Sequence, residues 1–229
     1  MSALKIHLNG AEFVPDISGA LFWPARQTLI ASDLHLEKGS AFAARGTLLP
    51  PYDSIATLAR LADAMARLSP AHVILAGDTF HDGKALSRMT AEAADRLEKL
   101  VASGPRFTFI VGNHDPEAAY FAAAAVTDEW REENIIIRHE PHFMAALGEI
   151  AGHLHPVASI DVRGRRLRRR CFVCDGTRLL LPAFGAYAGG LDVFDDGFAG
   201  IFPDGFDAVL IGGSQLHRFP SRQLARDAV

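Results

Sequence analysis

Ligand-type side chains follow five separate apolar segments of this 229-residue chain, and this repeated order constrains its fold more than any other feature. Each segment is short and rich in β-branched or aromatic residues, as strands are. Open α/β sheets place ligand sites where strands end, so these side chains are predicted to meet at one edge of a sheet. They are Asp33 and His35, Asp78, Asn113 with His114 and Asp115, His139, and His153 with His155.

The segments between these positions alternate between strand and helix patterns, which is typical of an α/β layer architecture. The helical segments carry apolar residues at helical spacing, and the Ala-rich stretch 117–126 is predicted to be helical from its propensity alone. The predicted strands are 28–32, 72–76, 107–111 and 135–137, and the other predicted helices are 53–68 and 86–101.

Beyond His155 the pattern changes to strands separated by Gly-rich spacers, which fit hairpins and loops. Together with the βα units before it, this predicts two packed sheets flanked by helices. A length of 229 residues does not require a second domain, so one domain over 1–229 is expected. The later predicted strands are 157–163, 167–174, 178–181 and 208–211.

Composition excludes two broad classes. Hydrophobic residues make up 49% and charged residues 22%, which is far from the signature of a disordered chain. The longest apolar stretch, at 122–126, falls well short of the roughly 20 residues of a membrane helix. The first ten residues turn polar before an apolar signal segment can form, so a cytoplasmic location is expected.

The two cysteines have CxxC spacing, which by itself suggests a redox or zinc site. Cys171 and Cys174 lie in a predicted strand, where residues three apart point to opposite faces. No second pair is present in the sequence to complete a zinc site. The two thiols are therefore predicted to be structural and reduced.

The seven donors at the strand ends comprise four imidazoles, two carboxylates and one amide oxygen, too many for one tetrahedral ion. They suit two ions that share Asp78, as in two-metal hydrolytic sites. Imidazole-rich ligation favours Mn, Fe or Zn over Mg or Ca. Residues two apart in extended chain project to the same side, so each Asp-x-His or His-x-His pair is predicted to serve one site. Glycines at 77, 112 and 152 leave room for an ion or phosphate beside the backbone.

His114 is left over beside Asn113 and is the candidate general acid for a leaving oxygen, with Asp115 as a candidate to orient its ring. In the fourth motif both His139 and His142 are available, and His139 is preferred because it directly follows the strand pattern. Any one of these histidines alone would more often be an ordinary polar residue. As a set, buried and unpaired at one edge, they would carry a heavy desolvation cost without a cation.

Read together, Asp33-x-His35, Gly77-Asp78, Gly112-Asn113-His114-Asp115, His139 and Gly152-His153-x-His155 resemble the five ordered motifs of the calcineurin-like metallophosphoesterases. The resemblance implies a four-layer αββα sandwich with a dinuclear centre at the strand ends. It assigns Asp33, His35 and His155 to one ion, Asn113, His139 and His153 to the other, and Asp78 to both. It also implies in-line attack on phosphorus by a metal-bridging hydroxide, with His114 near the leaving group.

A closer likeness, to the bacterial ligase-associated DNA-damage-response metallophosphoesterases, rests on longer strings over nearly the whole chain. It implies a Mn-dependent phosphodiesterase, often called an endonuclease, that acts on DNA beside an ATP-dependent ligase and a helicase. The strings are Leu21-Phe-Trp-Pro, Ser32-Asp-Leu-His-Leu-Glu-Lys-Gly, Gly77-Asp-Thr-Phe-His-Asp, His139-Glu-Pro, Gly152-His-Leu-His-Pro and Leu181-Pro-Ala-Phe-Gly-Ala-Tyr-Ala-Gly-Gly-Leu.

Basic residues give the remaining hints about substrate. The run 163–170 holds six arginines in eight residues, enough to contact several phosphates, although a basic hairpin can equally be a solvated strand edge. Lys38 and Arg45 are candidate phosphate contacts or plain surface residues. Three rival functions stay open: a phosphomonoesterase on nucleotides or phosphoproteins, a non-catalytic interaction module of the repair complex, and a metal-dependent amide hydrolase.

Overall fold

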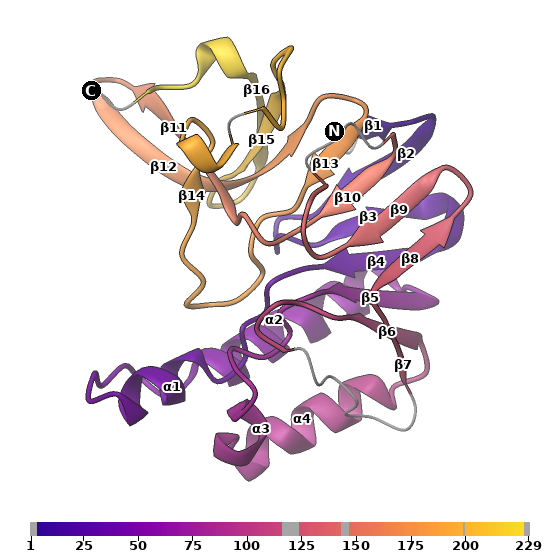
Figure 1. Cartoon of the computed structure of the whole chain (residues 1–229), viewed down its shortest axis with the longest axis vertical. Coiled ribbons are helices and arrows are strands. Elements are labelled where there is room, and N and C mark those ends of the chain that lie inside the picture. Colours follow the sequence, from indigo (N-terminus) through magenta and orange to yellow (C-terminus); the bar gives the residue numbers. More distant parts are fainter. Residues whose placement is uncertain (1–3, 116–123, 143–146, 199, 227–229) are drawn as a thin grey trace.

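Two mixed β-sheets packed face to face form the centre of the molecule, and the α-helices cover the outer face of the first sheet (Figure 1). The computed structural model describes residues 4–115, 124–142, 147–198 and 200–226. The α/β fold with two packed sheets predicted from the sequence is therefore confirmed.

The first sheet has seven strands in chain order. Its first four strands pair antiparallel, whereas β4 to β7 run parallel, so the carboxyl ends of the parallel strands lie on the same side of the sheet. The strands are β1 (Ile6–Leu8), β2 (Ala11–Pro15), β3 (Leu21–Trp23), β4 (Thr28–Ala31), β5 (His72–Ala76), β6 (Arg106–Ile110) and β7 (Ala124–Thr127).

The second sheet has the order β14-β11-β12-β13-β10-β9-β8, and β15 joins it beside β12 with β16 on its outer side. The neighbours β9, β10 and β13 are parallel. The strands are β8 (Glu129–Glu132), β9 (Ile135–Arg138), β10 (Glu149–Ala151), β11 (Pro156–Val162), β12 (Arg165–Cys174), β13 (Arg178–Leu180), β14 (Leu191–Asp192), β15 (Asp207–Ile211) and β16 (Leu216–Pro220).

Among the described residues, four α-helices lie between the strands of the first sheet: α1 (Lys38–Ala44), α2 (Asp53–Leu68), α3 (Ala85–Arg88) and α4 (Ala91–Val101). Helix α2 matches its predicted bounds and packs Leu58 and Leu61 against the sheet. The predicted helix 86–101 is broken at Met89, because the Thr90 hydroxyl accepts a hydrogen bond from the Ala93 N–H and starts α4 afresh.

Apolar side chains fill three layers. Besides the layer under the helices, a second lies between the sheets around Trp23 and Phe172, and a third covers the outer face of the second sheet around Phe198. In the described part of the chain this outer cover is the segment that carries the 3-10 helix η2 (Asp196–Phe198), together with Leu224, which directly follows the 3-10 helix η3 (Ser221–Gln223), rather than an α-helix. One further 3-10 helix, η1 (Pro24–Arg26), links β3 to β4.

The prediction of a helix at 117–126 is wrong where the structure describes it. Residues from Ala124 form β7, which pairs with β6 from Phe107 to Ile110, so sheet pairing overrides the helix propensity of alanine. Positions 117–123 lie outside the described residues. None of the described helices is long and apolar enough to cross a bilayer.

The cysteines lie in β12 as expected, and both are free. Cys171 is in the outer apolar layer, whereas Cys174 packs against the layer between the sheets, so the two thiols are on opposite faces.

Candidate metal centre

The predicted ligand residues come together where strands of both sheets end. Asp33, Asp78 and Asn113 follow β4, β5 and β6 of the first sheet, whereas His139 and the pair around His153 follow β9 and β10 of the second. The single sheet edge predicted from the sequence is therefore an edge shared by two packed sheets. Backbone contacts join them: the Gly152 N–H donates to the His139 carbonyl, and the His153 N–H donates to the Asp33 carboxylate.

The backbone at this edge is left-handed rather than extended, which corrects the prediction for the two-residue pairs. Asp33, His35, Asp78, His153 and His155 all have positive φ, between 44° and 66°. Such conformations are uncommon for residues with a side chain, and they persist where the surrounding structure enforces them, typically at functional sites. The Asp33/His35 pair lies in one donor group as predicted, whereas the prediction is wrong for the other pair, because His155 lies beside Asp33 and His35 and His153 lies beside Asn113 and His139.

Glycines at the strand ends make room for the ligand side chains themselves, not for an ion beside the backbone as predicted. A Cβ at Gly77 would lie 2.3 Å from Nδ1 of His139, and one at Gly152 would lie 2.4 Å from the Asp33 carboxylate. A Cβ at Gly112 would lie 2.2 Å from both the amide nitrogen and Oδ1 of Asp78. These three positions therefore accept no larger residue without displacing a neighbouring donor.

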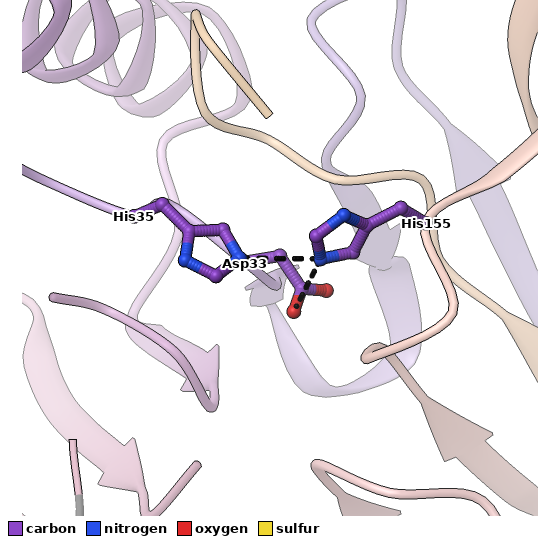
Figure 2. A group of neighbouring side chains, drawn as sticks. All are labelled: Asp33, His35 and His155. Atoms are coloured by element: carbon purple, nitrogen blue, oxygen red, sulfur yellow. Dashed lines mark hydrogen bonds and ion pairs between the residues drawn. The ribbon is translucent and has the colours of Figure 1, made fainter. Parts of the chain in front are cut away.

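The first donor group consists of Asp33, His35 and His155. Figure 2 shows the two imidazole rings meeting over the Asp33 carboxylate, with their Nε2 atoms 3.2 Å apart. The His155 Nε2 lies 3.1 Å from Oδ1 of Asp33. The other oxygen, Oδ2, accepts from the His153 N–H and lies 2.7 Å from the Ser32 hydroxyl. These contacts turn Oδ1 toward the rings.

The second donor group consists of Asn113, His139 and His153. The His139 Nε2 lies 2.9 Å from Oδ1 of Asn113 and 3.3 Å from Nδ1 of His153. The opposite ring nitrogen of His139, Nδ1, lies 3.2 Å from the Ala76 carbonyl, to which it donates. That contact fixes the tautomer and leaves Nε2 facing the other donors.

Asp78 lies between the two groups. Its Oδ2 is 3.7 Å from Nε2 of His35 and 3.4 Å from Nε2 of His139, while its Oδ1 accepts from the His114 N–H at 2.9 Å. Asp33 also comes near His139, but its 3.8 Å contact is to Nδ1, the nitrogen that donates to Ala76. The shared oxygen is therefore that of Asp78.

Burial and charge prepare this set to receive cations. Burial alone would raise the pKa of Asp33 and of Asp78, but the neighbouring histidines outweigh it and lower both, that of Asp78 to about 2. Burial lowers the pKa of His35 to about 3, which leaves its ring neutral. His139 is the exception: burial opposes its protonation, yet Asp78 and Asp33 raise its pKa to about 9. Binding a cation there must displace a proton.

The donor set fits two metal ions. Within each group the donor atoms are roughly as far apart as neighbouring ligands of an ion with bonds of about 2.1 Å, whose polyhedron edges are about 3.0–3.4 Å. Two buried carboxylates and facing imidazole nitrogens are also the arrangement that a divalent cation stabilises. Two overlapping clusters of this kind, Asp33-His35-His155 and Asp33-Asp78-His139, are present among the described residues.

His114 lies at the open side of the site, with its Nε2 4.0 Å from Oδ2 of Asp78 and 43% of its side chain exposed. Its Nδ1 donates to the His81 carbonyl at 2.9 Å, and the two rings stack at 16° with centroids 5.5 Å apart. Asp115 does not orient the ring as suggested from the sequence. Buried beneath the loop, it accepts from the Thr79 N–H, and burial together with Asp78 raises its pKa to about 6.

His81 is the site residue that the sequence pattern missed. Its ring packs edge-on against His35 as well as on His114, and burial, then the charge of Lys38, lowers its pKa. The only available signal was its position three residues after Asp78 in the same strand-end loop.

The other polar residues near the candidate metal centre differ in their burial and in their contacts. Lys38 is the first residue of α1, and its side chain is half-buried beside the site. Arg45 follows the end of that helix and is exposed, and its positive charge contributes to lowering the pKa of His81. Glu37 turns away from the centre and accepts from the Ser54 hydroxyl on α2. His142, the second histidine of the fourth motif, is exposed, and its backbone N–H donates to Glu149.

A two-sheet sandwich with a histidine-rich donor set at shared strand ends is typical of a metal-dependent hydrolase. The family model for calcineurin-like phosphoesterases matches residues 27–173, well over half of the chain, and the chain belongs to that family. The match includes four of the seven strands of the first sheet, β4 to β7, and all seven donor residues.

Among solved structures, the nuclease MPE of Pseudomonas putida superposes with a TM-score of 0.72 and 29% sequence identity, over 95% of this chain and 100% of that one. The E. coli phosphoesterase Yfce has 13% identity and a TM-score of 0.44, over 84% and 97% of the two chains. A search of the curated proteins found no significant match.

Proposed function

We propose that the chain is a dinuclear metallophosphodiesterase that cleaves DNA. The observation that carries the proposal is the pair of donor groups that share Oδ2 of Asp78, with the His114 ring beside that oxygen. The likeness to the Pseudomonas putida nuclease MPE supports a nucleic-acid substrate.

In the proposed allocation, Asp33, His35 and His155 hold one ion, Asn113, His139 and His153 hold the other, and Asp78 contacts both. Mn is the proposed metal, with Fe or Zn as alternatives, because the donors are mostly imidazoles. When bound, two such ions neutralise phosphate charge and lower the pKa of water.

The chain's own groups supply positioning and a proton. The His81 carbonyl keeps a proton on Nδ1 of His114, so Nε2, which lies 4.0 Å from Oδ2 of Asp78, is the atom that exchanges a proton with a leaving oxygen. The charges of Lys38 and Arg45 both lower the pKa of His81, and we propose that the two side chains attract the substrate's phosphate.

The test uses metal-stripped protein with Mn added back, assayed on bis(p-nitrophenyl) phosphate, p-nitrophenyl phosphate and a single-stranded DNA oligonucleotide. His139→Ala is compared with His142→Ala, a matched change at the neighbouring exposed histidine. We expect Mn to restore cleavage of the diester and the DNA, His139→Ala to abolish it, and His142→Ala to retain it. A preference for the monoester would replace the diesterase assignment, and loss of activity only in His142→Ala would overturn the donor allocation.

A further inference from the structure

The arginines of the sequence are concentrated on one protruding hairpin. Strands β11 and β12 pair from Val157↔Arg170 to Val162↔Arg165, and only the inner half of β12 pairs with β13 and β15. In Figure 1 this ribbon and α1 extend from the same side of the molecule, with the segment that joins β13 to β14 between them. Residues 156–170 contain six arginines and one aspartate, a formal charge of +5, which leaves −9 for the rest of a chain whose total is −4.

The base of this hairpin adjoins the metal centre. Strand β11 begins directly after His155, and Val157, two residues further on, lies at most about 7 Å along the chain from that ligand. The Leu191 N–H donates to the His155 carbonyl, and a Cβ at Gly190 would lie 2.8 Å from the same oxygen. The turn before β14 therefore packs on the first donor group.

Arginine side chains at the base of the hairpin contact the turn 188–190 on the side away from His155. By strand alternation Arg168 and Arg170 share the face of Phe172, which lies between the sheets. Arg168 donates to the Gly190 carbonyl at 2.8 Å, and Arg170 donates to the Ala183 carbonyl. The next residues after Ala183 bind the first ligand loop, because the Phe184 N–H donates to Ser32 and the Gly185 N–H to Asp33.

Between these parts lies a pocket of about 240 Å³. Its walls are Val157, the three arginines 168–170 and the turn 188–190. A Cβ at Gly189 would meet nothing within 4 Å, so the backbone of this turn is open to a ligand. Each guanidinium has five N–H donors, and the contacts recorded among the described residues occupy only one of them in Arg168 and one in Arg170. Guanidinium groups and an open glycine backbone are the chemistry that binds phosphate.

We propose that this arginine pocket binds a phosphate of the nucleic-acid strand next to the one being cleaved, and so selects polynucleotides over small diesters. The proposal rests on the phosphodiesterase function proposed above. An arginine-rich edge that only prevents strand pairing would need neither a pocket nor contacts that tie it to the ligand loops. The segregation of positive charge onto this hairpin in an otherwise acidic chain also steers a polyanion to the site.

The experiment compares Arg168→Gln/Arg169→Gln with Arg163→Gln/Arg165→Gln, which makes the same charge change on the same hairpin nearer its turn. Both variants and the wild type are assayed with Mn on bis(p-nitrophenyl) phosphate and on a single-stranded DNA oligonucleotide at several salt concentrations. On the small diester we expect unchanged hydrolysis in the turn variant, and in the pocket variant a much smaller loss than on DNA. For DNA, kcat/KM of the pocket variant should fall about 10- to 100-fold, the effect of losing charge-assisted hydrogen bonds. Its salt dependence should weaken by about 0.7 in log–log slope for each lost phosphate contact.

An equal loss in the turn variant, or a parallel loss on the small diester, would overturn the pocket as a phosphate site. Arg168→Lys/Arg169→Lys should recover the salt slope, and Arg168→Gln alone serves if the double variant does not fold. DNA binding by metal-stripped protein, followed by fluorescence anisotropy, separates this inference from the proposed function. A wild type that lacks diesterase activity contradicts the function, whereas the difference in DNA affinity between the two variants still decides whether the pocket binds phosphate.

Discussion

Replacing Gly77 by alanine should empty one half of the metal centre while the other half keeps its ion. Gly77 has φ +85°, and a Cβ there would lie within 2.3–2.5 Å of three atoms of His139. The left-handed backbone costs an L-residue about 1–2 kcal/mol, and overpacking in a tight interior costs about 1–3 kcal/mol. The His139 ring cannot yield easily, because it is 4% exposed and held between Asn113 and the Ala76 carbonyl. We therefore expect a loss of about 2–5 kcal/mol in the free energy of unfolding.

The matched control is Gly83→Ala in the same loop, where a Cβ meets nothing within 4 Å and φ is not left-handed. It should be neutral or stabilise the chain by up to about 1 kcal/mol. Denaturant unfolding of metal-stripped protein gives the stability, and elemental analysis after Mn loading gives the stoichiometry. We expect close to two ions per chain in the control, close to one in Gly77→Ala, and loss of diesterase activity only in the latter. Two ions and full activity in Gly77→Ala would refute the packing argument.

Three further outcomes are expected. His114→Ala should bind metal normally but lower kcat on a diester by about 10²- to 10⁴-fold, measured with metal content in parallel; an unchanged kcat would remove it from proton transfer. Burial, then Arg106, lowers the pKa of His72 to about 4, so the unfolded chain binds more protons. Stability is then fully present above about pH 6.5 and falls by up to about 3 kcal/mol toward pH 4; urea titrations should show a flatter profile for His72→Gln. Finally, burial raises the pKa of Cys174 to about 11 and that of Cys171 further, so thiol reagents should react slowly with native protein and reductant should leave Tm unchanged.

The sequence predicts most of the frame that carries the site. Helix α2 and strands β5 and β9 appear where periodicity and β-branched runs place them, because their burial is uniform along one face or throughout. The short strands β1 to β3 cannot be predicted in this way, because a segment of three to five residues is too short to show a period. Strand β7 fails for a different reason: its alanines favour a helix locally, and only the neighbouring strand β6 makes them pair.

The geometry of the candidate ligand residues cannot be predicted from sequence periodicity. A pattern of Asp33-x-His35 suggests extended chain, whereas the structure holds both residues left-handed, against their intrinsic preference. That conformation is enforced from outside the motif: the Asp33 N–H donates to the Gly77 carbonyl, the His35 N–H donates to the Asp78 carbonyl, and the Asp33 carbonyl accepts from Gly185. Two segments distant in sequence, at Gly77-Asp78 and at Gly185, thus hold one strained loop. The donor residues can be recognised from sequence because their chemistry is local, but their arrangement cannot, because the forces that bend the loop come from partners some forty to one hundred and fifty residues away.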